Sequence, residues 1–254
     1  MNRTLAIGDI AVARIGLGTN RLTNGAQRVA FVREAVAAGI GLVDTAYTYT
    51  SGESETTVGQ ALSPVPEGCV IATKGGWANG RPETIRQQID ESLRRLRLDS
   101  IPLYYLHRPD PEVPIEESLG AIQQARDAGK VRNVGISNVT VEQIERARSI
   151  VPIAAVQNRY NLGDRTFDAV VDACAAQGIA FVAYYPLQKG DLPTAVVTIA
   201  GQRGVTATQV ALAWLLRRSP TVLPIPGTLS LDHVRENLAA LDIDLTDAEL
   251  DSLA

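Results

Sequence analysis

The sequence predicts an α/β protein, a (β/α)8 (TIM) barrel preceded by an N-terminal β-hairpin. Short apolar runs alternate with longer amphipathic segments eight times along the chain, which is the pattern of a strand followed by a helix. The apolar runs are nearly continuous, as they are in parallel strands that helices cover. No change of composition interrupts the alternation, so we expect residues 1–254 to form a single domain.

The predicted strands are short apolar runs bounded by glycine or polar residues. Two runs around Gly8-Asp9, at residues 5–7 and 10–12, predict the hairpin. The barrel strands are expected at residues 15–17, 42–44, 69–73, 103–106, 131–136, 153–156, 180–183 and 222–225. A doubly wound open sheet is the structural alternative. It usually has a glycine-rich phosphate loop after its first strand, and Gly16-Leu17-Gly18 lacks the third glycine of that loop.

The predicted helices repeat apolar residues at helical spacing. The clearest begins at Pro82, which suits a first turn, and carries Ile85, Ile89, Leu93 and Leu96 along one stripe. The helices are expected at residues 26–38, 55–62, 82–96, 115–128, 141–149, 167–177, 194–203, 208–218, 231–240 and 247–253.

The composition of the chain argues against some classes of binding partner. The chain has 45% hydrophobic and 20% charged residues and a formal net charge of −4, which argues against a broad surface for nucleic acid or for an acidic membrane. No signal-peptide pattern and no membrane-spanning apolar run are present, so we expect a cytoplasmic protein. Cys69 and Cys174 lie in or beside apolar segments, and we expect buried free thiols.

Polar residues gather where the predicted strands end. The active site of a barrel lies at the carboxyl ends of its strands. The polar or small residues at these ends are Thr19, Asn20, Asp44, Lys74, His107, Ser137, Asn138, Gln157, Asn158, Tyr184, Gly227 and Thr228. We therefore expect a functional site at this end of the barrel.

Four of the residues at this end suit carbonyl chemistry. A tyrosine has a pKa near ~10, and a nearby ammonium group lowers it. Lys74, held by Asp44, would thereby make Tyr49 a usable general acid, and His107 would orient a carbonyl oxygen. Taken alone, Asp44 and Lys74 could form a structural ion pair, and His107 could be a core residue. Their occurrence at three successive strand ends favours the catalytic interpretation.

Seven motifs, in order, resemble the aldo-keto reductase family over nearly the whole chain. They are Asp44-Thr-Ala-Tyr-Thr-Tyr49, Ala72-Thr-Lys74-Gly, Tyr105-Leu-His107-Arg-Pro, Gly135-Ile-Ser-Asn138, Val156-Gln157-Asn-Arg-Tyr, Ala183-Tyr184-Tyr-Pro-Leu187 and Ile225-Pro-Gly-Thr228 with Glu236-Asn237. Residues 131–241 resemble the branch that includes bacterial pyridoxal reductases.

The resemblance implies an NADPH-dependent reduction of an aldehyde or ketone, with Tyr49 as proton donor and Asp44, Lys74 and His107 as its catalytic partners. Ser137, Asn138 and Gln157 would bind the nicotinamide carboxamide, and Tyr184 would stack on its ring. The other coenzyme-binding residues implied are Gly18, Thr19, Leu187, Lys189, Gly227, Thr228, Ser230, His233, Glu236 and Asn237.

Two positions depart from the family pattern. Gly227 stands where a lysine is common, and His233 stands where an arginine usually binds the 2′-phosphate of the coenzyme. Arg235 is close in sequence, but two residues along a helix place it on another face. We expect NADPH as the coenzyme, with NADH accepted and only modest discrimination between the two.

The substrate pocket is expected to be open and polar, lined by Asn20, Trp77 and Arg108. The sequence ends at Ala254, so we expect no long C-terminal loop over the site. A polar or bulky carbonyl compound is therefore the expected substrate. We expect a monomer whose partners are small molecules, without metal, nucleic acid or membrane. The alternatives are a nicotinamide-binding sensor or accessory subunit, and a barrel enzyme acting on phosphorylated sugars.

Overall fold

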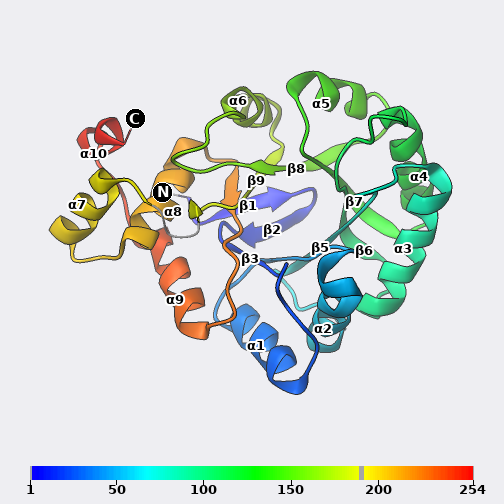
Figure 1. The fold of residues 1–254 in the computed structure, drawn as a ribbon, viewed down its shortest axis with the longest axis horizontal. Coiled ribbons are helices and arrows are strands. Elements are labelled where there is room, and N and C mark those ends of the chain that lie inside the picture. Colours follow the sequence, from blue (N-terminus) through cyan, green and yellow to red (C-terminus); the bar gives the residue numbers. More distant parts are fainter. Residues whose placement is uncertain (1, 189–191, 254) are drawn as a thin grey trace.

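The computed structural model describes residues 2–188 and 192–253 and shows a parallel eight-stranded barrel (Figure 1). Each barrel strand pairs in parallel with the next one along the chain. The strands are β3 (Gly16–Gly18), β4 (Leu42–Asp44), β5 (Val70–Gly75), β6 (Ile101–Leu106), β7 (Val131–Ser137), β8 (Ile153–Arg159), β9 (Ala180–Tyr184) and β10 (Val222–Pro224). A parallel bridge between Gly18 and Gly227 joins the two edges. The predicted fold class is confirmed.

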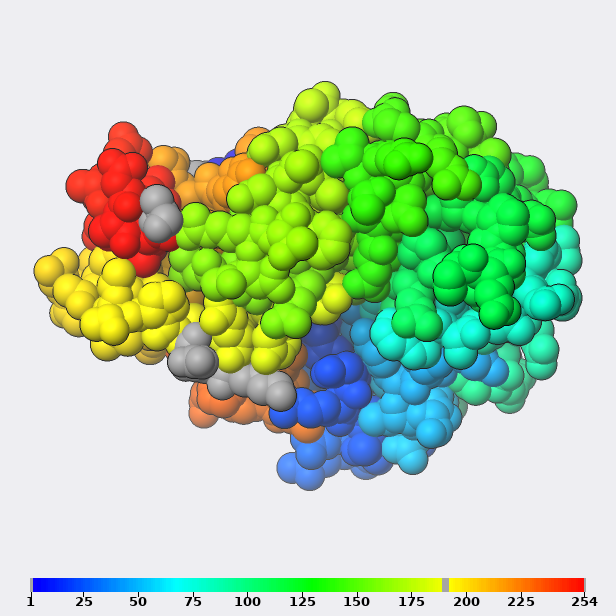
Figure 2. All heavy atoms as spheres, turned by 45° about the horizontal axis from the view of Figure 1, so that its top comes forward, coloured from blue at the N-terminus to red at the C-terminus, as the bar shows by residue number. Residues whose placement is uncertain are grey.

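A ring of helices surrounds the strands (Figure 1). The helices are α1 (Ala26–Ala37), α2 (Glu53–Leu62), α3 (Pro82–Leu96), α4 (Ile115–Asp127), α5 (Val141–Arg148), α6 (Asp168–Gln177), α7 (Thr194–Arg203), α8 (Ala207–Arg218), α9 (Leu231–Ala239) and α10 (Asp247–Ser252). The sequence did not predict two short 3-10 helices, η1 (Tyr49–Gly52) and η3 (Ala240–Asp242). Arg203 of α7 bonds Glu249 of α10 at 2.6 Å, and these two helices lie together at one corner in Figure 2.

The predicted hairpin, β1 (Thr4–Ile7) and β2 (Ile10–Ala13), lies over the centre of the barrel (Figure 1). Ile7 and Val12 are buried and belong to one apolar cluster with barrel residues such as Leu42, Val70 and Leu103. Since these barrel residues lie at or near the beginnings of their strands, the hairpin closes the amino-terminal end of the barrel. The opposite end is left for the functional site.

Arg14 is 1% exposed, an unusual environment for a guanidinium group. It donates hydrogen bonds to the backbone carbonyls of Asn2, Leu216, Ser219 and Val222, at 2.6 to 3.1 Å. Burial lowers the pKa of Arg14 to about 10, which leaves it protonated at neutral pH. This one side chain therefore ties the segment before β1 to the end of α8 and the start of β10.

We expect the substitution Arg14→Met to lower the free energy of unfolding by more than about 3 kcal/mol. The reason is that several buried carbonyls would lose their donor, and each such loss costs about 1–3 kcal/mol. Urea unfolding measures the effect. Arg33→Met is a matched control because Arg33 also donates to two carbonyls, those of Gln60 and Ala61, but at the surface. An equal and small effect at both positions would contradict the structural role of Arg14.

Within residues 2–188 and 192–253, no helix has both the length and the apolar character needed to cross a membrane. Cys69 and Cys174 are free thiols, and both are buried as expected.

Candidate active site

A cavity of about 1300 Å³ opens at the carboxyl ends of the barrel strands. That volume is large enough for a coenzyme and a small substrate. The predicted site residues that line it are Gly18, Thr19, Asn20, Asp44, Tyr49, Trp77, His107, Ser137, Asn138, Gln157, Tyr184, Leu187, Gly227, Thr228, Ser230, His233, Glu236 and Asn237. Lys74 and Arg108 are not part of the lining, and the predicted residue Lys189 lies outside the described residues.

Lys74 is fully buried beneath the cavity and donates in three directions. Its Nζ lies 2.5 Å from Asp44 Oδ1, 2.7 Å from the carbonyl oxygen of Thr45 and 3.4 Å from Tyr49 Oη. All three ammonium hydrogens are thereby used. Burial alone would lower the pKa of Lys74, but Asp44 and Tyr49 together outweigh burial and raise it. Lys74 therefore stays charged at neutral pH.

The pKa of Tyr49 corrects one expectation from the sequence. Lys74 does act to lower this pKa, but burial of the phenol is the larger effect, and the pKa is raised above its ordinary value. Tyr49 is therefore a neutral phenol at neutral pH, with its oxygen beside an ammonium group. A group that must give a proton to a substrate has to hold that proton first, so the arrangement is compatible with general acid chemistry.

His107 follows β6 and faces two aromatic rings. Its ring centroid lies 6.0 Å from that of Tyr49 and 4.7 Å from that of Trp77. Burial, together with the charges of Lys74 and Arg108, lowers the pKa of His107 to about 3, so the imidazole is neutral at neutral pH. Within the described residues its Nδ1 is buried without a hydrogen-bond partner.

The neutral His107 predicts a pH-dependent stability. An unfolded chain binds a proton on this histidine near pH 6.5, but the folded chain does so only near pH 3. The low pKa of His107 therefore adds its full contribution to the free energy of unfolding above pH 6.5. This contribution is lost as the pH falls from 6.5 towards 3. We expect His107→Gln to lose less unfolding free energy than the wild type between about pH 7 and about pH 5. Equal losses in urea titrations would contradict the buried neutral state.

A strained loop presents Tyr49 to the cavity. Thr50 and Ser51, in η1, have φ of 45° and 55°, which is costly for residues other than glycine. Thr50 Oγ1 compensates by donating to the carbonyl of Leu22 at 2.8 Å and accepting from the backbone N–H of Ser54 at 3.0 Å. These bonds fix η1 against the loop that follows β3.

The residues expected to bind a carboxamide form a connected set. Asn138 has φ of 59°, and its Nδ2 donates to the carbonyl of His107 and to Ser137 Oγ, both at 3.0 Å. Its Oδ1 accepts from the hydroxyl of Tyr184 at 2.8 Å. Gln157 Nε2 donates to Asp44 Oδ2 at 2.7 Å, a contact that the sequence did not predict. Burial raises the pKa of Asp44, while Lys74 and Gln157 act in the opposite direction.

Asn158 differs from its neighbours at the strand ends. It was expected among the polar residues of the site, but its side chain bonds both the N–H and the carbonyl of Val139. The cavity lining does not include it. The side chains of adjacent residues on a strand point to opposite faces, so Gln157 points inward and Asn158 outward.

Ser230 caps the start of α9, and the residues that follow it shape the far end of the cavity. The hydroxyl of Thr228 lies 3.1 Å from His233 Nδ1 and accepts from the backbone N–H of Ser230. Thr206 of the loop before α8 donates to Glu236 at 2.6 Å. Free N–H groups and hydroxyls at this helix end favour an anion.

Trp77, one of the residues expected to line the substrate pocket, lies between His107 and Arg108. Its side chain is 44% exposed, and the guanidinium of Arg108 lies 4.6 Å from the centroid of its ring.

The sequence did not single out several lining residues, among them Arg21, Arg28, Tyr185 and Thr208. Arg28 and Thr208 lie on helices, and only the packing of α1 and α8 brings them to the cavity.

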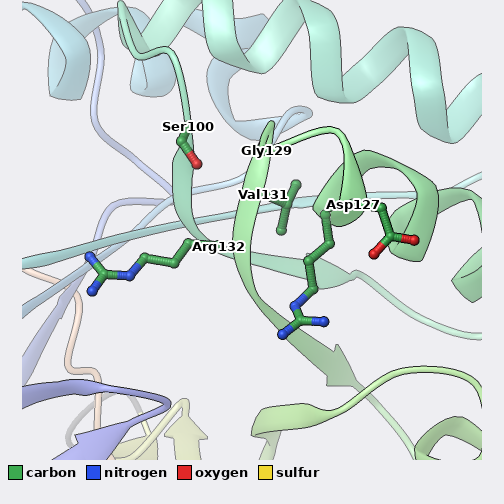
Figure 3. Close-up of a pocket in the computed structure, with 6 residues that line it drawn as sticks. Ser100, Asp127, Gly129, Val131 and Arg132 are labelled. Carbon is green, nitrogen blue, oxygen red and sulfur yellow. The ribbon is translucent and has the colours of Figure 1, made fainter.

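A second cavity, of about 430 Å³, lies between the end of α4 and the start of β7 (Figure 3). Ser100, Arg126, Asp127, Gly129, Val131 and Arg132 line it. It lies at the amino-terminal end of the barrel, away from the predicted catalytic residues. Throughout the described part of the chain, no group of three His, Cys, Asp or Glu side chains could hold a metal ion.

A parallel barrel with a large cavity at the carboxyl ends of its strands defines the class of (β/α)8-barrel enzymes. The chain belongs to the aldo/keto reductase family, whose model matches residues 14–254. It is therefore an NAD(P)H-dependent oxidoreductase. The resemblance expected from the motifs is confirmed.

Three proteins that are similar to this chain support the same family assignment. The chain is 36% identical to pyridoxine 4-dehydrogenase of Escherichia coli, over 99% of this chain and 97% of that protein. It is similar to the crystal structure of the thermostable aldo-keto reductase Tm1743, with a TM-score of 0.92, 30% identity and 98% of each chain covered. An aldo-keto reductase from Klebsiella pneumoniae, solved with NADP and acetate, has a TM-score of 0.89 and 32% identity, over 100% of this chain and 94% of that one.

Proposed function

We propose that this protein reduces the carbonyl group of an aldehyde or ketone with NADPH, and that Tyr49 donates the proton. The single observation that supports this most is the buried cluster of Lys74, Asp44 and Tyr49. It places an ammonium group 3.4 Å from a phenol that faces a large cavity. The bound NADP of the Klebsiella pneumoniae relative supports the choice of coenzyme.

The residues present fit a nicotinamide coenzyme. Ser137, Asn138 and Gln157 offer hydroxyl and amide groups at one edge of the cavity, and Tyr184 offers an aromatic face. At the other edge, the N–H groups at the start of α9 suit a phosphate. When bound, the reduced coenzyme supplies the hydride.

The side chains of this protein orient the carbonyl group, donate the proton and stabilise the charge that remains. His107, a neutral imidazole, donates to the substrate oxygen and orients it. Tyr49 gives its proton to the same oxygen as negative charge develops there. Lys74 stabilises the phenolate that remains, and Asp44 with Gln157 fixes Lys74 in place. The cycle is completed when Tyr49 regains a proton from water.

The preferred substrate is a polar or bulky carbonyl compound. Trp77 presents an exposed ring beside His107, and Arg108 adds a positive charge on that ring. A flat, polar substrate would stack on Trp77 beside this charge, whereas a short alkyl aldehyde would use less of the ring. The relative that acts as pyridoxine 4-dehydrogenase makes pyridoxal a natural member of a test panel.

The test is the oxidation of NADPH in the presence of pyridoxal, aromatic aldehydes, keto sugars and short alkyl aldehydes. We expect turnover with the aldehydes and the highest kcat/KM for a polar aromatic one. Coenzyme binding without turnover on any carbonyl would favour the alternative of a sensor or accessory subunit. The highest kcat/KM for a short alkyl aldehyde would contradict the proposed substrate class.

A further inference from the structure

The cavity contains few cations for a coenzyme that carries several phosphate charges. Among its described lining residues, the only lysine or arginine side chains are Arg21 and Arg28. Lys74 lies deeper and is bonded to Asp44, Thr45 and Tyr49. This inference rests on the proposed use of NADPH, and it concerns which residue binds the phosphate that distinguishes NADPH from NADH.

Helix α9, on which the sequence predicted this phosphate site, provides no permanent cation to the cavity. Gly227 has no side chain, and His233 shares a hydrogen bond with the hydroxyl of Thr228 at 3.1 Å. Arg235 forms an ion pair with Asp232 and is not among the lining residues. The helix therefore offers N–H groups and hydroxyls, but a cation has to come from a neighbouring element.

Arg28 lies on the first turn of α1, and α1 packs beside α9 (Figure 1). Its side chain is half-buried and lines the same cavity as Thr228 and Ser230. Within residues 2–188 and 192–253, the guanidinium of Arg28 has no hydrogen bond and no ion pair. By contrast, Arg33 of the same helix is bonded to the carbonyls of Gln60 and Ala61. Among the described residues, Arg28 is thus a cation without a bonding partner, at the end of the cavity where α1 packs beside α9.

We propose that Arg28 binds the 2′-phosphate of NADPH and is the main determinant of the preference for NADPH over NADH. The nicotinamide end of the cavity is formed by residues of β7, β8 and β9, whereas Arg28 approaches from α1, next to the start of α9. There its guanidinium and the hydroxyls of Thr228 and Ser230 can bind one phosphate together. An arginine suits this task because its planar fork donates two parallel hydrogen bonds to phosphate.

The test measures coenzyme binding without any carbonyl substrate. Dissociation constants for NADPH and NADH are determined from nicotinamide fluorescence for the wild type, Arg28→Gln, Arg28→Lys and Arg235→Gln. We expect Arg28→Gln to weaken NADPH binding by about 10- to 100-fold, as for loss of a hydrogen-bonded charge, and to leave NADH binding nearly unchanged. Arg28→Lys should retain part of the affinity, and Arg235→Gln should behave as the wild type.

A second probe separates the phosphate from the rest of the coenzyme. We expect 2′,5′-ADP to compete with NADPH more strongly than 5′-AMP for the wild type, and equally for Arg28→Gln. Equal weakening of NADPH and NADH, or unchanged NADPH binding in Arg28→Gln, would overturn the proposal. Failure of the wild type to bind either coenzyme would instead overturn the proposed function. Thermal unfolding confirms that each variant is folded.

Discussion

Replacing Tyr49 with phenylalanine is expected to lower kcat by about 10²- to 10⁴-fold, the usual contribution of general acid catalysis. The ring remains and keeps its contact with Lys74, whose Nζ lies 4.8 Å from the ring centroid. Only the proton donor is lost, so NADPH affinity should not change. Steady-state kinetics with an aromatic aldehyde and fluorescence titration with NADPH measure the two quantities.

Tyr47→Phe is the matched control for this substitution. Tyr47 lies on the same loop, but its hydroxyl donates to Glu91 at 3.3 Å rather than facing the cavity. This variant should keep nearly the full kcat. If Tyr49→Phe reduced aldehydes as fast as the wild type, Tyr49 would not be the proton donor.

The largest effect on both stability and activity is expected for Lys74→Met. Removing Lys74 leaves Asp44, 1% exposed, without its cationic partner. Breaking a buried ion pair in this way typically costs about 3–5 kcal/mol of unfolding free energy. Activity should also fall steeply, because the phenolate formed on Tyr49 would have no positive charge beside it. Urea unfolding and kcat at neutral pH measure the two losses.

A double variant separates the two roles of Lys74. In Asp44→Asn with Lys74→Met, no unpaired charge remains buried, so a large part of the lost stability should return. Activity should stay low, because the ammonium group is still absent. Recovery of kcat together with stability would show that Lys74 acts only as a structural residue.

The sequence alone predicted the barrel and most of the residues around its cavity. Alternation of apolar runs and amphipathic helices is a local signal, and it was sufficient to place every barrel strand within a few residues of its observed position. Asp44, Lys74 and His107 were expected to meet because parallel strands end on one face of a barrel. The same rule could not separate Gln157 from Asn158, because both stand at the end of one strand.

The tertiary structure decided what depends on contacts across the barrel and on burial. Gln157 of β8 reaches Asp44 of β4 only because the sheet closes, and 113 residues separate them in the chain. Burial outweighs the ammonium group and raises the pKa of Tyr49, which no motif could reveal. Arg28 reaches the cavity because α1 packs beside α9. Sequence patterns thus determined which elements form and where they end, because those signals are local. The packing of distant elements decided the charge states and the partners of the site residues.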